Sequence, residues 1–388
     1  MVQSSAVLAS IHELPAALRE IIEQHRDQAD ADRRLPSELT EALRAAGAFR
    51  LLTPRTNGGF EASLADAARL YEAFGYIDAP VAWNIWNGNC GFAAALLGDR
   101  AIDEIWGGDA DPIIANSARI AGAATVADDG FVLSGRWDIV SAIDIADWVA
   151  LFGLVMDGDG PRMLPIGAPD VRVFFVRRVE VEVLDTWHTT GMRATGSNTV
   201  IADSVRVPSC RAISPFSPPR DDAGAVYRIP AFTLASHGAA SIVVGAAQAA
   251  IDAVIAMAPT KATDNGTLAT RAHAQSQIAA AQMNVHAARL LLRDAATDID
   301  AAALAGEPVG ELLRARLRAA MSHAAIVSRE ALGTCQRLAS SSAVYAGTPV
   351  ERIVRDGIAA AQHMILSETH LDILGRILFG VDPGTPII

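Results

Sequence analysis

Two segments in the middle of the chain concentrate the residue types that can hold a flat ring with a polar edge. Residues 135–148 read GRWDIVSAIDIADW, and residues 185–198 read DTWHTTGMRATGSN. Tryptophans can cover the faces of such a ring, while Ser141 and Ser197 can offer hydroxyl groups to its edge or tail. A flavin has this shape and these polar groups, so the two segments favour a flavin-binding function.

These segments belong to a short β-type section between two long helical sections. Residues 11–110 place apolar side chains at helical spacing, whereas residues 113–207 alternate and are rich in β-branched types. A Pro/Ser-rich stretch at 214–220 marks a boundary, and from about residue 232 the pattern is helical again. We therefore expect an α+β, mostly α fold with three domains. They are an N-terminal helical domain (1–112), a middle β-barrel or sandwich domain (113–213) and a C-terminal four-helix bundle (214–388).

Local signals predict the individual elements. One helix is expected to end at Gly47, and further helices are expected over residues 64–74 and 80–97. Strands are expected at residues 113–117, 121–126, 131–140, 148–155, 171–176, 181–184 and 200–207. Breaks near residues 259–266, 304–310 and 347–349 divide the last section into four helices, for which a bundle is the simplest packing.

The composition argues against several functions. A net charge of −12 does not suit a nucleic-acid surface, which needs clustered lysine and arginine. Cys90, Cys210 and Cys335 are widely spaced and form no CxxC or Cys/His pattern, so neither a disulfide framework nor a metal site is indicated. No signal-peptide pattern is present, and the apolar runs are interrupted before the roughly 20 residues that span a bilayer. We expect a cytoplasmic protein with no membrane or nucleic-acid partner.

The order of a helical domain, a β-domain and a helical bundle resembles the acyl-CoA dehydrogenase fold over essentially the whole chain. Residues 47–64 (GAFRLLTPRTNGGFEASL) are similar to the connector between the early helices of that family. Residues 191–198 (GMRATGSN) resemble its late β-domain signature, and the spacing to Pro208 also fits. The resemblance implies a flavoprotein that assembles as a homotetramer.

Within that fold the details resemble the two-component flavin-dependent monooxygenases. Dehydrogenases usually carry Thr-Glu and Gly-Ser-Asp before the flavin and often Tyr-Glu-Gly near the C-terminus. Residues 114–124 (IANSARIAGAA) and 355–372 (RDGIAAAQHMILSETHLD) contain neither phrase. The monooxygenases typically carry GRW, then a serine and an Asp-Trp pair, which residues 135–137, Ser141 and residues 147–148 match. The resemblance also points to a histidine seven residues after an Arg-Asp pair, and His363 has that spacing.

The resemblance assigns roles to particular residues. It implies that Ser141 lies by flavin N5 and that His363 lies near the edge that carries oxygen. The candidate cofactor contacts are Asn116, Ser117, Trp137, Ser141, Trp187, Arg193 and Ser197, and the candidate substrate pocket is Trp86, Cys90 and His363. Histidine suits proton transfer because its ordinary pKa is about 6.5.

One position departs from the pattern of the monooxygenases. Alignment back from Trp106 places Cys90 where many members have a histidine that acts as a base toward a phenol. A thiol with an ordinary pKa of about 8.5 is a poor replacement. Oxidation at nitrogen, sulfur or an activated carbon needs no such base and remains open.

Each candidate also has a structural interpretation. Ser141 can simply end a strand, His363 can be a half-buried residue of an alanine-rich helix, and Asn116 can lie on an edge strand. Arg193 and Ser197 can shape a turn. Trp83 and Trp86 lie three residues apart on one helix, which favours packing over substrate contact.

The leading hypothesis is an oxygenase that accepts exchangeable reduced FMN or FAD from a separate reductase. It would use O₂ to oxygenate a small organic substrate through a flavin C4a-(hydro)peroxide. No NAD(P)H-binding fingerprint occurs, which agrees with an external reductase. The first alternative is an FAD-dependent dehydrogenase with a base at an unexpected position. The second is a non-catalytic assembly or binding module of this fold.

Overall fold

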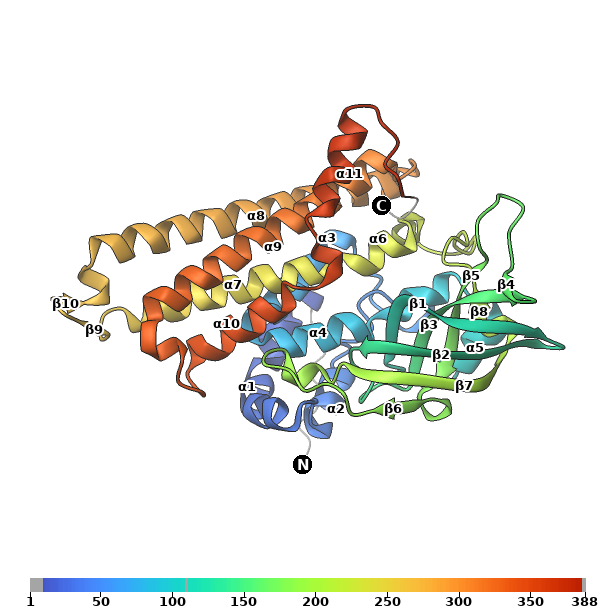
Figure 1. Ribbon diagram of the computed structural model, residues 1–388, viewed down its shortest axis with the longest axis horizontal. Coiled ribbons are helices and arrows are strands. Elements are labelled where there is room, and N and C mark those ends of the chain that lie inside the picture. The colour runs from blue at the N-terminus through green and yellow to red at the C-terminus, as the bar shows by residue number, and fades with distance from the viewer. Residues whose placement is uncertain (1–9, 109–110, 386–388) are drawn as a thin grey trace.

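The computed structural model describes residues 10–108 and 111–385. Figure 1 shows the long C-terminal helices at one end of the molecule and the sheet at the other, with the N-terminal helices against both. This arrangement is the helical, β and helical order that the sequence predicts. The α+β fold of the acyl-CoA dehydrogenase type is confirmed.

The N-terminal helices are α1 (Leu14–Asp32), α2 (Ser37–Ala45), α3 (Leu64–Ile77), α4 (Ala79–Gly88) and α5 (Asp99–Trp106). Two of them, α3 and α4, begin at side chains that cap them. The Ser63 hydroxyl accepts the Asp66 N–H at the start of α3, and the Asp78 carboxylate accepts the Val81 N–H at the start of α4. After α2 the chain turns at Gly47, whose φ of 79° suits glycine.

The helix expected over residues 80–97 is wrong in its second half. α4 stops at Gly88, and a 3₁₀ turn, η3 (Cys90–Ala95), follows. Asn89 lies between them outside the helical region of φ and ψ. Its side-chain oxygen accepts the Leu51 N–H at 2.8 Å, while its amide nitrogen donates to the carbonyls of Ala48 and Ile85, each at 2.8 Å. These side-chain bonds replace the backbone bonds that would have continued the helix.

The β-domain is a single mixed sheet with the strand order β6-β7-β2-β1-β3-β5-β8, and β4 pairs with β3. The strands are β1 (Ile114–Ala127), β2 (Gly130–Val140), β3 (Trp148–Asp157), β4 (Gly160–Pro161), β5 (Val171–Arg177), β6 (Glu182–Leu184), β7 (Asn198–Pro208) and β8 (Ala212–Ile213). β1 and β3 run parallel, and the other neighbours are antiparallel. The first two predicted strands are one strand, because β1 continues through an irregularity between Ser117 and Gly122.

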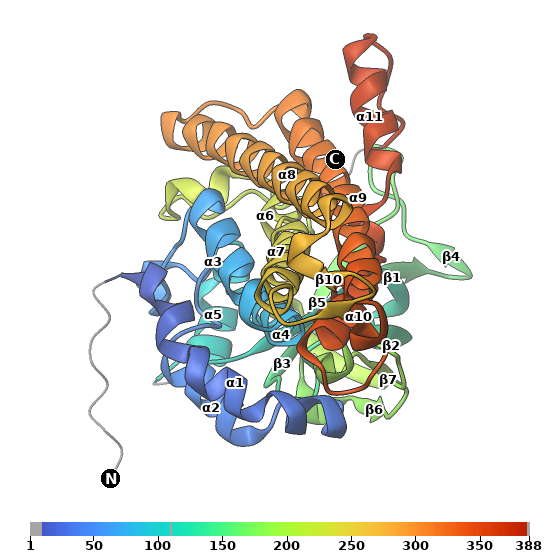
Figure 2. The ribbon, with the colours of Figure 1, turned by 90° about the vertical axis from the view of Figure 1, so that its left-hand side faces the viewer.

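The C-terminal section contains more helices than the four expected. They are α6 (Ala231–Ser236), α7 (Gly238–Met257), α8 (Ala272–Ala305), α9 (Glu311–Ala339), α10 (Pro349–Ala360) and α11 (Thr369–Leu378). The four long helices form the bundle, while α6 and α11 are short additions that the breaks in the sequence do not reveal. Figure 2 shows α7 at the centre, between α3, α8, α9 and α10.

Helix α7 is apolar because it is the core of the molecule. The stretch Ala231–Met257 is long and apolar enough to cross a membrane, but 67% of its most apolar window is buried inside the protein. It crosses α3 very closely: a Cβ on Gly245 would lie 2.2 Å from the Glu72 carbonyl oxygen, and one on Gly75 would lie 2.5 Å from the Ile242 carbonyl oxygen. Only glycine fits at both positions, so this crossing fixes the N-terminal helices on the bundle.

Candidate functional site

Three buried hydroxyl groups form a row beside the end of β2. Ser141, just after β2, is 5% exposed, and Ser197 and Thr195, just before β7, are 2% and 1% exposed. The Ser197 oxygen lies 2.7 Å from the Ser141 oxygen and 2.7 Å from the Thr195 oxygen. The sequence predicted Ser141 and Ser197 as a pair, and the structure brings them into direct contact. It adds Thr195, which the sequence analysis missed although it stands two residues before Ser197.

The protons of this row point in one direction. Thr195 donates to the Met192 carbonyl at 2.8 Å, so it must accept from Ser197, and Ser197 in turn must accept from Ser141. At the other end, the Trp83 Nε1–H of α4 donates to Ser141 at 3.2 Å. The hydroxyl proton of Ser141 is thereby directed to Ser197. The Ser141 oxygen has one lone pair left, and this lone pair can accept a hydrogen bond from a bound molecule.

An aromatic cluster joins the hydroxyl row to His363. Trp83 and Trp86 meet edge to face at 4.8 Å, and the His363 ring lies edge-on to them with centroids 5.4 Å from Trp83 and 5.9 Å from Trp86. Trp83 therefore contacts Ser141 through its N–H and His363 through its ring. The structure brings the two predicted catalytic residues, 222 positions apart in the printed sequence, into contact with one indole.

His363 differs from its sequence-based description in two ways. It does not lie on a helix, because α10 ends at Ala360 and His363 is extended, with φ −62° and ψ 134°. Its Nδ1 accepts the Ile365 N–H at 3.2 Å, which places the ring proton on Nε2. Burial lowers the pKa of His363 to about 4, so the ring is neutral near pH 7 rather than half-protonated. It can act there as a hydrogen-bond donor through Nε2.

Cys90 and Asn116 lie together where α4 meets the sheet. The Cys90 thiol is buried and lies 3.9 Å from the Asn87 carbonyl oxygen, which also accepts the Asn116 amide at 3.1 Å. Burial raises the pKa of Cys90 to about 12, against the opposing hydrogen bond with Asn116. The thiol is therefore protonated and cannot serve as a base. Ser117, the next residue of β1, is also buried.

Two predicted cofactor contacts, Trp137 and Arg193, have structural partners of their own. Trp137 is fully buried in the sheet, and its Nε1 donates to the carbonyls of Arg119 and Phe152 at 3.1 and 2.9 Å. Arg193 donates to the carbonyls of Asp30 and Thr189 at 3.0 and 3.2 Å, which ties it to α1. A cofactor could reach either side chain only by displacing these bonds, so the structure favours packing roles for Trp137 and Arg193.

Trp187 lies nearer to the hydroxyl row. Its Nε1 donates to the Met192 carbonyl at 2.9 Å, which is the same oxygen that accepts the Thr195 hydroxyl. The ring is half-buried and remains a candidate flavin wall. Trp86 uses its Nε1 to donate to the Ala235 carbonyl of α6 at 2.8 Å, which holds the aromatic cluster against the bundle.

Asp356 of α10 holds the loop that carries the hydroxyl row. Its carboxylate is 3% exposed and accepts the Met192 N–H at 2.7 Å. Arg352 and Arg355 approach it to 3.6 and 3.7 Å, and they also reach Asp78 and Asp30 of the N-terminal domain. Burial raises the pKa of Asp356 to about 7, against the nearby Arg355 guanidinium. The sequence analysis used the pair Arg355-Asp356 only as a spacing marker and missed this positioning role.

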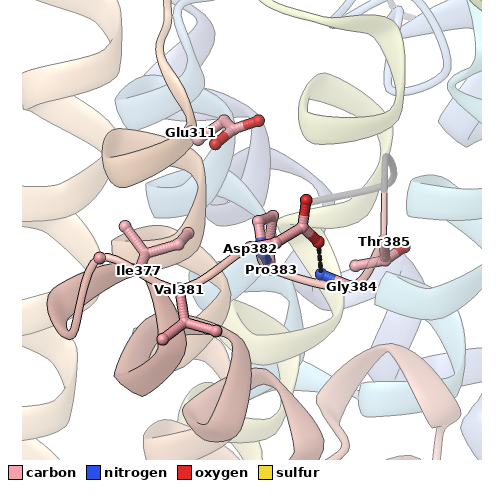
Figure 3. Close-up of a pocket in the computed structure, with 8 residues that line it drawn as sticks. Glu311, Ile377, Val381, Asp382, Pro383, Gly384 and Thr385 are labelled. Atoms are coloured by element: carbon pink, nitrogen blue, oxygen red, sulfur yellow. Dashed lines mark hydrogen bonds between the residues drawn. The ribbon is translucent and has the colours of Figure 1, made fainter.

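The open hollows of the surface lie elsewhere. One of them, with a volume of about 730 Å³, lies between α9 and the segment after α11. Figure 3 shows residues that line it, among them Glu311, Ile377 and Asp382. A second hollow lies between α1, α3, α7 and α8. Neither contains a residue of the hydroxyl row or the aromatic cluster. Within residues 10–108 and 111–385, no group of three or more His, Cys, Asp or Glu side chains could hold a metal ion.

Comparison with known proteins identifies the family. The description "Acyl-CoA dehydrogenase, N-terminal domain" matches residues 11–106, and "Acyl-CoA dehydrogenase, C-terminal domain" matches residues 237–368. The oxygenase subunit HsaA, a flavin-dependent monooxygenase of Rhodococcus jostii, is 30% identical over 89% of this chain and 92% of its own length. The indole-3-acetate monooxygenase of Pseudomonas putida is 27% identical over 95% of this chain and 94% of its own.

Solved structures agree with the sequence relatives. The HsaA monooxygenase of M. tuberculosis has a TM-score of 0.88 at 28% identity and covers 98% of this chain and 99% of its own. XiaF from Streptomyces sp., solved with FADH2 and glycerol, has a TM-score of 0.87 at 26% identity and covers 97% of this chain and 98% of its own. The chain belongs to the acyl-CoA dehydrogenase family. Within it, the protein is a flavin-dependent monooxygenase of the oxygenase-component type, which confirms the enzyme class that the leading hypothesis names.

Proposed function

We propose that this protein uses reduced FMN or FAD from a separate reductase, together with O₂, to oxygenate a small organic substrate at the aromatic cluster. The observation that supports this proposal is that Trp83 contacts both Ser141, through its N–H, and His363, through its ring. When bound, the reduced flavin supplies the electrons that activate O₂. The protein supplies the shape of the site, its hydrogen bonds and the exclusion of water.

The hydroxyl row provides a fixed hydrogen-bond acceptor at Ser141. Because the Thr195 hydroxyl donates to the Met192 carbonyl at one end of the row, the other hydroxyls donate in the same direction. A reduced flavin carries an N–H at N5, which this acceptor matches. We therefore propose Ser141 and Ser197 as contacts to the edge of the flavin and Trp187 as a wall beside it. We propose Asn116 and Ser117 as further cofactor contacts.

His363 provides the opposite kind of group, a neutral N–H donor. Its Nδ1 is occupied by the Ile365 N–H, so Nε2 is the nitrogen that can donate to an oxygen atom of a bound molecule. A pKa of about 4 keeps the ring from taking up a second proton near neutrality. We propose that His363 holds a proton at Nε2 for oxygen and shields the site together with Trp83 and Trp86.

The chemistry at Cys90 narrows the substrate class. A thiol whose pKa is raised to about 12 cannot remove a proton from a phenol at neutral pH. We therefore propose a substrate that is already electron-rich at the reacting atom, such as an amine, a sulfide or an activated ring carbon. The similarity to an indole-3-acetate monooxygenase supports this proposal, since an indole ring is electron-rich without losing a proton.

The test is anaerobic titration of the protein with reduced FMN and reduced FAD, followed by exposure to O₂ with candidate substrates. We expect tight binding of the reduced form, weak binding of the oxidised form and incorporation of one oxygen atom from ¹⁸O₂. A yellow protein that retains oxidised FAD and reduces an artificial electron acceptor would instead support a dehydrogenase. Failure to bind flavin in either redox state would support a non-catalytic role.

We further propose a homotetramer that works in the cytoplasm, with the domain division at 112/113 and 213/214. Large apolar side chains are exposed on the outer helices, including Leu290 and Leu291 on α8, Leu378 at the end of α11 and Phe379, which is 88% exposed. Exposed apolar groups of this size are typical of subunit contacts. Light scattering gives the assembly directly, and a stable monomer would contradict the tetramer.

A further inference from the structure

Arg318 is a buried cation with no counter-charge. It lies in the first third of α9 and is 2% exposed, with its guanidinium carbon 5.0 Å from the centre of the Phe232 ring of α6. Among the described residues, its side chain makes no hydrogen bond and no ion pair. Burying a lone charge is strongly unfavourable, and contact with an aromatic ring recovers only part of that cost. The Phe232 contact alone therefore does not explain a charged Arg318.

Further unpaired donors surround this guanidinium. Arg314, one turn earlier on α9, has a buried Nε without a partner, and the neutral ring of His370 on α11, which can donate through one nitrogen, lies close enough to Arg318 to feel its charge. The Thr233 hydroxyl, next to Phe232, is also buried and unpartnered. Burial and the neighbouring Arg314 lower the pKa of Arg318 to about 10, and burial and Arg318 lower the pKa of His370. Three elements thus supply donors and positive charge to one region.

In the described part of the chain, no carboxylate neutralises the cationic group formed by Arg318, Arg314 and His370. Glu368 is the acidic residue nearest to His370, and it pairs instead with Arg329 at 2.8 Å. Glu311, at the start of α9, and Asp372, on α11, are exposed. The group therefore has the composition of an anion site, with arginines that can bind two oxygens at once.

The cationic group is connected to the candidate site by two short segments. On α6, Phe232 stands three residues before Ala235, whose carbonyl accepts the Trp86 Nε1–H. On α9, Ser322 follows Arg318 by one turn and donates to the Ser367 carbonyl at 2.6 Å. Ser367 lies between His363 and His370 in the chain. The donors are thus linked through both segments to residues of the aromatic cluster.

We propose that Arg318, supported by Arg314 and His370, binds an oxyanion carried by a molecule in the candidate site. The oxyanion is the phosphate of the flavin tail or a carboxylate of the substrate. Naming these two carriers rests on the function proposed above, whereas anion binding itself does not. In either case the anion replaces the missing counter-charge and orients the molecule relative to Ser141 and His363.

The first arm of the test compares flavins with and without a phosphate. Dissociation constants are measured anaerobically for reduced FMN, reduced FAD and reduced riboflavin, on the wild type and on Arg318→Gln. If the flavin phosphate is the ligand, FMN binding weakens at least tenfold in the variant and riboflavin binding does not change. Arg316→Gln is the matched control, because Arg316 is exposed on the same helix. It removes the same charge and should leave all three constants unchanged.

The second arm needs no flavin. Thermal unfolding of the flavin-free wild type, Arg318→Gln and Arg316→Gln is followed with inorganic phosphate and with benzoate. Stabilisation by benzoate that is lost only in Arg318→Gln, with unchanged FMN binding, assigns the oxyanion to the substrate. Arg318→Met serves as a second variant, since it keeps the length of the side chain and removes the charge. It guards against a folding defect in Arg318→Gln.

The outcomes separate this proposal from the proposed function. A wild type that binds neither FMN nor riboflavin argues against the oxygenase, while the phosphate and benzoate arm still tests the anion site. If Arg318→Gln and Arg318→Met match the wild type with every flavin and both anions, the site does not exist. In that event, the counter-charge of Arg318 comes from elsewhere, such as a second copy of the chain.

Discussion

Replacing Ser197 with alanine tests the direction of the hydroxyl row. The Ser197 hydroxyl makes two buried bonds of 2.7 Å, one to Ser141 and one to Thr195. Its removal leaves the Ser141 proton and a Thr195 lone pair without partners. A buried polar group left unsatisfied costs about 1–3 kcal/mol, so we expect the free energy of unfolding to fall by about 2 kcal/mol.

The same change should alter the reaction with oxygen. Without Ser197, the Ser141 hydroxyl is free to rotate and no longer presents a fixed acceptor. If the loss of this fixed acceptor lowers the free-energy barrier to H₂O₂ release by about 1.4 kcal/mol, the release of H₂O₂ from protein-bound reduced flavin in the absence of substrate rises roughly tenfold. The assay is stopped-flow reoxidation with peroxide detection, and urea unfolding gives the stability on the same samples.

A matched control separates stability from chemistry. Thr199 is also buried and bonded at both sides, to Thr186 at 2.9 Å and to Asp138 at 2.9 Å, but it lies outside the row. Thr199→Val should lower stability by a similar amount and leave H₂O₂ release unchanged. Equal peroxide release from Ser197→Ala and the wild type would refute the reasoning, as would an equal increase in Thr199→Val.

Three more predictions concern single titratable groups. Because the pKa of His363 is lowered to about 4 in the folded protein, the wild type should lose stability as pH falls from about 6.5 towards 4. His363→Gln should flatten that slope in a plot of Tm against pH, and parallel curves would contradict this. Because burial raises the pKa of Asp356 to about 7, its carboxyl loses its proton at a higher pH in the folded protein than in the unfolded chain. The wild type should therefore lose stability relative to Asp356→Asn as pH rises from about 5 to about 8, and a constant difference in Tm would show that the carboxyl does not titrate there. Cys90, buried and with a pKa raised to about 12, should resist iodoacetamide at pH 8 while the half-buried Cys210 reacts. Mass spectrometry of the native protein decides this, and rapid labelling of Cys90 would be the contrary result.

The sequence predicts the order of the domains well, because their periodicities differ. Apolar spacing separates the helical sections from the alternating strands, and the motif around Ser141 and Ser197 places both hydroxyls at neighbouring strand ends. The end of α4 could not be predicted, since it depends on Asn89 bonding to backbone groups about 40 residues away. Likewise, periodicity assigned His363 to a helix although the chain leaves the helix at Ala361.

The charges and partners inside the site were also beyond the sequence. The ordinary pKa of histidine suggested a group poised at neutrality, whereas the surrounding rings and helices desolvate His363. The role of Asp356 depends on a contact with a residue 164 positions earlier. Composition and spacing carry no information on such distant contacts, so Trp137 and Arg193 could not be told apart from Ser141 as candidate flavin contacts.

The bond from Asp356 to the Met192 amide has a consequence for synthesis of the protein. During translation, the loop with Thr195 and Ser197 leaves the ribosome long before α10 does. Until α10 is made and docked, that loop lacks the carboxylate that holds Met192 in its left-handed conformation. A nascent chain therefore cannot assemble the hydroxyl row, and the capacity to bind flavin should arise only at the end of synthesis.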